Sequence, residues 1–265
     1  MRLSRLCAAI LLSVGLLSAC GKASTENQVI IGTIAGPESE LMATVKQVAA
    51  DEYNLDVKIV EFNDYSLPNQ ALADGSIDAN MFQHEPYLET AMKAKKYHFG
   101  VLGSAFIYPM GIYSTKHKKL ADIPNGAIVA IPNDPSNEAR ALLLLKQAKL
   151  ITLKPHVGTT ATLQDIDTNP KQLQIKELDA AQLPRALDDV DFAAINTNYA
   201  MLAGLMPSTD AFVLETSSSP YANVVVVRGT ELKQAKFITL MKALHSKPVI
   251  DKAAELFKGQ AIIGW

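Results

Sequence analysis

The sequence has little cysteine and no excess of positive charge. Its 265 residues include two cysteines, and 25 lysines and arginines stand against 27 aspartates and glutamates, for a net charge of -2. Proteins that bind a nucleic-acid backbone carry basic patches, which this balance does not favour, so we predict no nucleic-acid partner. The 14 glycines and 13 prolines are too few for collagen-like or low-complexity sequence. With 48% hydrophobic residues, the chain can bury a substantial core in one or two domains.

The first residues have the features of a bacterial export signal. Arg2 and Arg5 precede an apolar run over Leu6–Leu17, and about a dozen residues are too few to cross roughly 30 Å of hydrocarbon. The run ends in Leu17-Ser18-Ala19-Cys20-Gly21. Small residues before a cysteine match the lipobox at which bacterial lipoproteins are cleaved and acylated.

We therefore predict a signal peptide over residues 1–19, a lipid on Cys20 and a lipidated tether over residues 20–28. The domain would be anchored to the cell membrane and face the periplasm or the cell exterior. The alternative is an ordinary secretory signal in which Cys20 is incidental. Because Cys7 leaves with the signal and Cys20 carries the lipid, the folded part has no cysteine for a disulfide, thiol catalysis or a metal.

The sequence lacks the common signatures of enzyme and metal sites. It contains no GxxxxGK[ST], GxSxG or HExxH motif. The segment Asp165–Asn169 begins like a calcium loop, but Pro170 stands where such a loop needs glycine. The five histidines are dispersed, with no i, i+4 pair: His84, His98, His117, His156 and His245. We predict no metal, no cofactor and no enzymatic activity. The enzyme alternative is a hydrolase that uses Ser217–Ser219 with one of these histidines, although nothing near the serines would activate them.

After the tether, short β-branched runs alternate with helical periods, which is typical of sheets covered by helices. Strands are predicted over residues 29–34, 56–62, 77–82, 101–108, 127–131 and 223–227, with helices between them and over 231–244 and 249–258. The pattern occurs in two similar halves with two crossings between them. We predict two lobes, each a mixed, mostly parallel sheet flanked by helices, with lobe 1 over 29–111 and 226–265 and lobe 2 over 112–225. A ligand cleft would lie between the lobes, since α/β folds bind ligands at the carboxyl ends of their strands.

Aromatic side chains gather where the predicted strands of the first lobe end. Tyr65 lies in a polar loop, and Phe82-Gln83-His84-Glu85-Pro86-Tyr87 spans the passage from a strand to a helix. Rings carried by loops can face a cleft. A wall of rings suits a polarisable group such as a thioether, which gains about 0.3–1.5 kcal/mol against an aromatic ring. Core packing is the alternative role for these rings and for His84.

Polar residues at the strand ends of the second lobe complement the rings. If Asp134 caps the helix that follows it, Arg140 lies in the first two turns, where the helix dipole disfavours a cation by about 0.3–1 kcal/mol. Either Glu138 or Asp134 compensates this charge, or Arg140 and the helix N–H groups receive a ligand carboxylate. Three asparagines are either neutral acceptors for an amino group or ordinary turn and capping residues: Asn196, Asn198 and Asn223. Together with the rings, these groups describe a pocket for an amino acid with an apolar side chain.

Seven segments follow one another in an order that is more specific than any segment alone. They are Phe62-Asn63-Asp64-Tyr65, Ile77-Asp78-Ala79-Asn80, Phe82-Gln83-His84-Glu85-Pro86-Tyr87, Pro132-Asn133-Asp134-Pro135, Gln182-Leu183-Pro184-Arg185, Ala194-Ile195-Asn196-Thr197 and Ser219-Pro220-Tyr221-Ala222-Asn223. With the terminal Gly264-Trp265, they strongly resemble the MetQ/NlpA lipoprotein family. The resemblance covers essentially the whole mature chain.

The resemblance implies a type II periplasmic-binding-protein fold and a role in delivering methionine, expected as L-methionine, to an ABC importer. Its partners would be methionine, a membrane permease and a cytoplasmic ATPase, and the protein would be a monomer held at the membrane by its lipid. Arg140 would pair with the ligand carboxylate, while Asn196 and Asn223 would hold the backbone ammonium and carboxylate. The thioether would be enclosed by Tyr65, Phe82, His84 and Tyr87. Alternative ligands are a methionine-containing dipeptide, D-methionine or another apolar amino acid, and a less favoured role is that of a surface lipoprotein with an interaction function.

Overall fold

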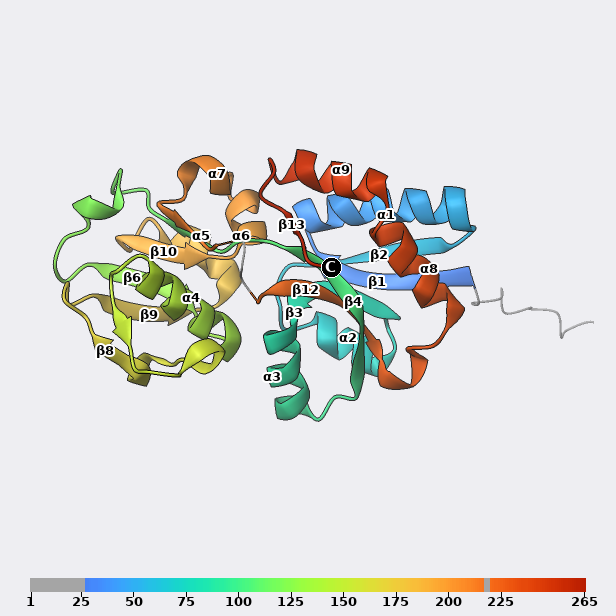
Figure 1. Ribbon diagram of the computed structural model, residues 1–265, viewed down its shortest axis with the longest axis horizontal. Helices are drawn as coiled ribbons and strands as arrows, with labels where there is room; N and C mark the ends of the chain where they lie inside the picture. The colour runs from blue at the N-terminus through green and yellow to red at the C-terminus, as the bar shows by residue number, and fades with distance from the viewer. Residues whose placement is uncertain (1–26, 217–219) are drawn as a thin grey trace, which may run out of the picture.

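The computed structural model describes residues 27–216 and 220–265, which form two α/β lobes side by side (Figure 1). The predicted signal peptide, the lipidation site Cys20, most of the tether and the serine run Ser217–Ser219 lie outside the described residues. The second lobe is at the left of Figure 1 and the first at the right, and the C-terminus lies close to their junction.

The first lobe contains a six-stranded sheet with the strand order β13-β4-β12-β3-β1-β2. Its strands are β1 (Gln28–Ile34), β2 (Asp56–Phe62), β3 (Ala79–His84), β4 (Phe99–Ile107), β12 (Ala222–Arg228) and β13 (Ile262–Ile263). β1 is parallel to β2 and β3, whereas β12 is antiparallel to β3 and β4, and β13 is antiparallel to β4. β12 carries a continuous buried run of valines, because it lies inside the sheet and both of its faces are covered.

Helices cover both faces of this sheet. They are α1 (Pro37–Tyr53), α2 (Pro68–Asp74), α3 (Glu85–Lys95), α8 (Ala235–Leu244) and α9 (Lys247–Leu256). In Figure 1, α1 and α9 lie above the sheet and α2 and α3 lie below it, and α8 packs against α1. Helical spacing puts Leu41, Val45 and Val48 on one face of α1, where they join the main core of the lobe beneath α8 and α9.

The second lobe contains a five-stranded sheet with the strand order β11-β5-β10-β6-β9. Its strands are β5 (Gly111–Tyr113), β6 (Ile128–Pro132), β9 (Gln174–Leu178), β10 (Phe192–Ile195) and β11 (Val213–Leu214), and a separate ladder pairs β7 (Thr152–Leu153) with β8 (Ile166–Thr168). The helices are α4 (Pro135–Gln147), α5 (Leu183–Ala186), α6 (Thr197–Leu202) and α7 (Pro207–Asp210). Short 3₁₀ helices lie at Leu120–Asp122, Gly158–Thr160, Leu163–Asp165, Ala180–Gln182 and, in the first lobe, Gly229–Glu231.

The start of α4 agrees with the sequence prediction. Asp134 is the N-cap, and its Oδ1 accepts a hydrogen bond of 3.0 Å from the backbone N–H of Asn137. Pro135 occupies the first turn, where its missing N–H costs no hydrogen bond. Arg140 therefore lies in the first two turns of α4, as predicted.

The strand pairing differs from the expectation of mostly parallel sheets. In the second lobe β6 is parallel to β9 and β10, but β5 is antiparallel to β10 and β11. Parallel and antiparallel strand pairs are therefore nearly equal in number in both sheets. The physical reason lies at the crossings, because the strands that carry the chain between the lobes, β4 into β5 and β11 into β12, run antiparallel to their neighbours.

The crossings also locate the lobe boundaries. The first lies between β4, which ends at Ile107, and β5, which begins at Gly111. All of β12 belongs to the sheet of the first lobe, so the second crossing comes before Ala222, a few residues upstream of the expected boundary at 225/226.

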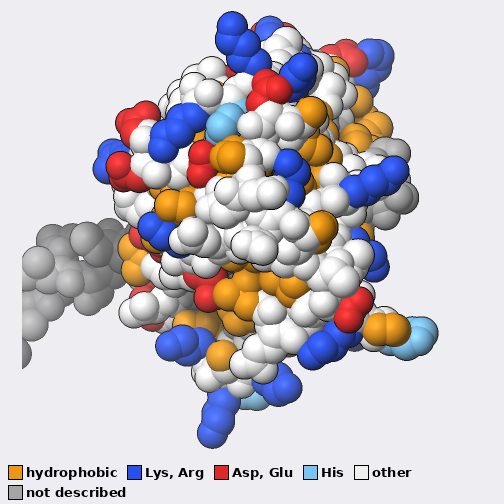
Figure 2. Space-filling model, turned by 90° about the vertical axis from the view of Figure 1, so that its left-hand side faces the viewer, with side chains coloured by type: hydrophobic (Ala, Val, Ile, Leu, Met, Phe, Trp, Pro, Cys, Tyr) orange, Lys and Arg blue, Asp and Glu red, His pale blue; other side chains and the backbone are white. Residues whose placement is uncertain are grey.

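No helix in the described part of the chain has both the length and the apolar character needed to cross a bilayer. Figure 2 shows the outer end of the second lobe, where cationic and anionic side chains are interspersed over the surface.

Candidate ligand-binding site

A cavity lies between the two lobes. The first lobe contributes residues from α1, from the loop after β2, from β3, α3 and β12, and from the position just after β4, and the second lobe contributes residues from α4 and the start of α6. All seven ligand-site residues predicted above line this one cavity: Tyr65, Phe82, His84, Tyr87, Arg140, Asn196 and Asn223. The fold thus brings together side chains that are up to 158 positions apart, the span from Tyr65 to Asn223.

The aromatic rings form one wall of the cavity. The ring centroids of Tyr65, Phe82 and Tyr87 lie 5.8–6.0 Å from one another, and Tyr87 stands edge-on to both of the others. The Tyr87 hydroxyl donates a hydrogen bond of 2.9 Å to the backbone oxygen of Tyr65, which fixes the two rings relative to each other. Burial raises the pKa of the Tyr87 phenol, so this wall is uncharged at neutral pH. Such a wall suits an apolar and polarisable group.

His84 bridges the two lobes in its neutral form. Its Nε2 lies 3.3 Å from Oδ1 of Asn137, and its Nδ1 accepts a hydrogen bond of 3.2 Å from the backbone N–H of Tyr87. The Asn137 amide nitrogen donates to both carboxylate oxygens of Asp134, so its Oδ1 is an acceptor and the proton of His84 resides on Nε2. Burial, and secondarily the charge of Arg140, lowers the pKa of His84 to about 3.

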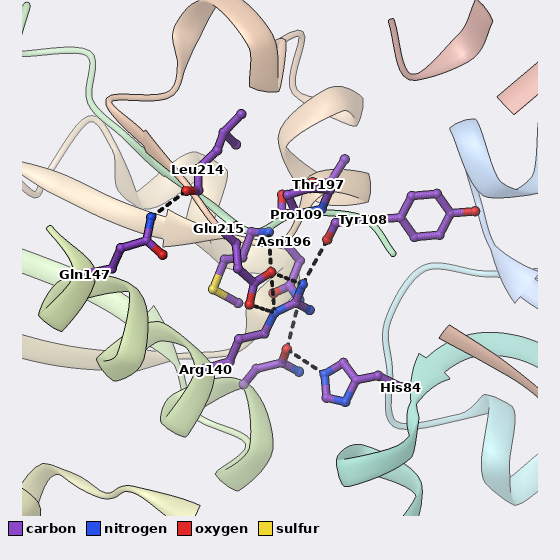
Figure 3. A network of polar contacts seen from close by, with 11 residues as sticks. His84, Tyr108, Pro109, Arg140, Gln147, Asn196, Thr197, Leu214 and Glu215 are labelled. Atoms are coloured by element: carbon purple, nitrogen blue, oxygen red, sulfur yellow. Dashed lines mark hydrogen bonds and ion pairs between the residues drawn. The ribbon is translucent and has the colours of Figure 1, made fainter. Parts of the chain in front are cut away.

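Arg140 is held by a carboxylate that the sequence analysis did not identify. Its Nε and Nη2 lie 3.0 and 2.5 Å from the two oxygens of Glu215, and Nη2 also donates to the backbone oxygen of Tyr108 at 2.9 Å (Figure 3). Glu215 also accepts a hydrogen bond of 3.1 Å from the backbone N–H of Met110. Within the described part of the chain, Nη1 of Arg140 makes no hydrogen bond, and Arg140 lines the cavity.

The compensating anion for Arg140 is therefore neither of the two that the sequence suggested. Glu138 accepts a hydrogen bond from the backbone N–H of Leu163, and Asp134 caps α4. Glu215 stands 75 positions from Arg140, just after β11, and no periodicity or motif of the sequence links the two.

The asparagines present both free acceptors and free donors. Asn196 donates from Nδ2 to Oδ1 of Asn137 at 2.9 Å, and its own Oδ1 is buried with no partner among the described residues. Asn198 accepts a hydrogen bond of 2.7 Å from the Tyr65 hydroxyl across the cleft, which leaves its Nδ2 without a partner there. Asn223 lies opposite His84 in the ladder between β3 and β12.

Glu38 is a second acidic residue that sequence reasoning missed. It lies in the first turn of α1, lines the cavity and is 2% exposed, and its Oε1 accepts a hydrogen bond of 2.8 Å from Nδ2 of Asn223. Burial raises the pKa of Glu38 to about 8, and the hydrogen bond from Asn223 partly opposes this rise. In the sequence, an acidic residue at this place matches the ordinary preference of helix N-termini for negative charge, so it gave no signal.

The arrangement can hold a small zwitterion with an apolar side chain. Polar side-chain atoms without partners among the described residues line the cavity together with the aromatic rings. Among the described residues, no three His, Cys, Asp or Glu side chains are grouped so that they could bind a metal ion.

Comparisons with known proteins agree with this geometry. The family model described as NlpA lipoprotein matches residues 29–265. The probable D-methionine-binding lipoprotein MetQ of Vibrio cholerae is 45% identical over 251 residues, which cover 94% of this chain and 93% of the relative.

Two solved structures are similar over nearly their whole length. A periplasmic substrate-binding protein of an ABC transporter from Coxiella burnetii has a TM-score of 0.87 and 54% identity, and the match covers 89% of this chain and all of that one. A nutrient-binding protein from Burkholderia cenocepacia, solved with methionine bound, has a TM-score of 0.87 and 49% identity, with coverage of 89% and 100%. The chain has the two-lobed fold of the periplasmic substrate-binding proteins and belongs to the NlpA lipoprotein family.

Proposed function

We propose that this protein is a lipid-anchored substrate-binding protein that captures methionine, with L-methionine as the expected ligand, and delivers it to an ABC importer. Capture of methionine is supported by the methionine-bound relative from Burkholderia cenocepacia and by the name of the Vibrio cholerae relative. That name specifies D-methionine, whereas L-methionine is what the family resemblance implies. The observation that carries it is the single cavity in which an aromatic wall faces Arg140 and free amide groups from the other lobe.

In the proposed complex, each part of methionine meets a matching group. The carboxylate binds Nη1 of Arg140, and Asn196 and Asn223 hold the backbone ammonium and carboxylate. The thioether chain lies among four rings, contributed by Tyr65, Phe82, His84 and Tyr87. His84 acts as a neutral wall and hydrogen-bond donor, since its low pKa keeps it uncharged at neutral pH.

Binding would favour the closed arrangement of the lobes. Three hydrogen bonds already bridge the cleft, from the Tyr65 hydroxyl to Asn198, between His84 and Asn137, and from the Tyr199 hydroxyl to the backbone oxygen of Asn63. A ligand shifts an open–closed equilibrium only through the additional contacts it makes in the closed state, so residues of both lobes contribute to affinity. The closed, loaded protein would then dock on a membrane permease driven by a cytoplasmic ATPase. It would act as a monomer tethered through lipidated Cys20, and it would perform no catalysis.

Calorimetric titration tests this proposal. The full-length protein is purified in detergent, denatured to remove any bound ligand, refolded, and titrated with L-methionine, D-methionine and methionine-containing dipeptides. We expect one-to-one binding of L-methionine. A response to D-methionine or a dipeptide alone would keep the fold and change the transported ligand, and silence toward every compound would reject the proposal.

Arg140→Ala tests the site within the same experiment. We expect a loss of at least about 2 kcal/mol of binding free energy, because a buried carboxylate loses its charged partner. The matched control is Arg228→Ala, which removes an arginine that pairs with Asp78 and Glu231 in the first lobe, away from the cavity. Unchanged affinity in Arg140→Ala would exclude Arg140 from the site.

A further inference from the structure

Glu38 has one oxygen that nothing in the described part of the chain satisfies. Its Oε1 accepts from Asn223 at 2.8 Å, while Oε2 is fully buried without a hydrogen-bond partner. The residue is 2% exposed and lines the cavity between the lobes. A buried carboxylate oxygen without a donor is costly to a fold, which indicates that a donor arrives with the ligand.

Glu38 is an acidic residue of the first lobe, whereas Arg140 is a basic residue of the second. Glu38 lies in the first turn of the 17-residue helix α1 of the first lobe, and Arg140 lies near the start of α4 in the second lobe. The charge of Arg140 is already balanced by Glu215, 2.5 Å away. Among the described residues, three buried groups that line the cavity and can accept a hydrogen bond have no partner: Oδ1 of Asn196, the hydroxyl of Tyr108 and Oε2 of Glu38. Burial raises the pKa of the Tyr108 phenol, so Glu38 is the group among them that can carry a full negative charge near neutral pH.

We propose that Glu38 is the counter-ion of the ligand's ammonium group, with Oε2 as the acceptor. This inference rests on the proposed function, in which the cavity binds an α-amino acid. Glu38 would then determine specificity, since it favours ligands with a free, charged amino group over analogues in which that group is missing or acylated.

Binding of the ammonium group should release a proton. Burial raises the pKa of Glu38 to about 8, so at pH 7 the empty site holds this residue mainly as the carboxylic acid. A cation beside the carboxyl lowers that pKa again. The proton leaves Glu38 for the buffer, and the carboxylate that remains pairs with the ligand ammonium.

Neighbouring groups do not supply this proton near pH 7. Burial raises the pKa of the tyrosines and lowers that of His84 to about 3, so all of them are neutral with or without ligand. Arginine is charged throughout. These groups, which line the cavity or interact with Glu38, are Tyr65, Tyr87, Tyr108, Tyr199, His84 and Arg140.

The test measures protons released on binding. The full-length protein in detergent is titrated with L-methionine at pH 7 in phosphate and in Tris, whose ionisation enthalpies differ widely. The dependence of the observed heat on the buffer gives the number of protons released. We expect the release of a large part of one proton per methionine, because a carboxyl group whose pKa is raised above 7 is mainly protonated at pH 7.

Glu38→Gln should abolish this proton release and lower the affinity for L-methionine by at least about tenfold. The loss should be absent for 4-(methylsulfanyl)butanoate, which lacks the amino group. Glu40→Gln is the matched control, because Glu40 is exposed in the same turn of α1.

Each outcome separates the two proposals. If wild-type protein binds 4-(methylsulfanyl)butanoate as tightly as it binds L-methionine, or if Glu38→Gln binds L-methionine as tightly as wild type does, the role of Glu38 is wrong and the methionine-binding function stands. If wild-type protein does not bind L-methionine, the proposed function fails and this inference fails with it. The wild-type measurement needs no variant, so it is decisive even if Glu38→Gln does not fold.

Discussion

The pair formed by Arg140 and Glu215 should contribute strongly to stability as a unit. Both side chains are nearly buried, at 4% and 10% exposure, and they meet through two short contacts of 3.0 and 2.5 Å. Removing one charge leaves the other buried without its partner, which costs about 3–5 kcal/mol, whereas removing both costs far less. We therefore expect a coupling energy of about 3 kcal/mol between the two positions.

A double-mutant cycle measures this coupling. The variants are Arg140→Met, which keeps the aliphatic stem, Glu215→Gln, which keeps the acceptor for the N–H of Met110, and their combination. Urea unfolding of each ligand-free protein is followed by circular dichroism at pH 7, and the slopes are compared to confirm that the same structure unfolds.

A more exposed ion pair in the first lobe provides the control. Arg228 and Glu231 meet at 3.0 Å, but both are 24% exposed, so Arg228→Met and Glu231→Gln should couple by about 1 kcal/mol or less. Additive effects of the Arg140 and Glu215 substitutions, or single-variant losses below about 1 kcal/mol, would refute the conclusion that Glu215 neutralises and positions Arg140.

Three further predictions concern closure and pH. Tyr65→Phe removes the 2.7 Å hydrogen bond to Asn198 across the cleft, so methionine affinity measured by calorimetry should fall about fivefold, the equivalent of about 1 kcal/mol. Without ligand, the contribution of neutral His84 to the free energy of unfolding should decline as the pH falls from 6.5 toward 3. The reason is that the imidazole binds a proton in the unfolded chain over this range but not in the folded protein. If the free energy of unfolding of His84→Asn follows the same pH dependence as that of wild type, the prediction is wrong. A Cβ on Gly36, at φ 100°, would lie 2.6 Å from Cδ2 of Leu202 in the other lobe, so Gly36→Ala should weaken binding, and Leu202→Ala should restore part of that loss if the clash is the cause.

Much of the fold could be predicted because its signals are local. Strand β2 has the predicted bounds, Asp56–Phe62, and Asp134 caps α4 as expected. These features depend on alternation along a strand and on hydrogen bonds between residues three positions apart. Strand β3 was predicted two residues early, at 77–82, because the alternation in Ile77-Asp78-Ala79-Asn80 does not mark the point at which pairing begins.

The candidate site could be predicted only in part. The rings and asparagines were found because they follow strands or begin helices, and the family resemblance strengthened their assignment. Glu215 and Asn137 were missed, since a glutamate after a short strand and an asparagine in a first helical turn are ordinary in any protein. Their roles depend on which side chains lie opposite them.

The sequence by itself determined the alternation of strands and helices, the helix cap at Asp134, the order of family segments and the set of residues able to form a pocket. Only the tertiary structure decided the partners: Glu215 for Arg140 over 75 positions, and Glu38 for Asn223 over 185. It also decided the mixed pairing of the sheets at the two crossings. The physical reason is range, because helix and strand patterns repeat within a few residues, whereas the burial of a charge and the identity of its partner are set by packing between distant segments.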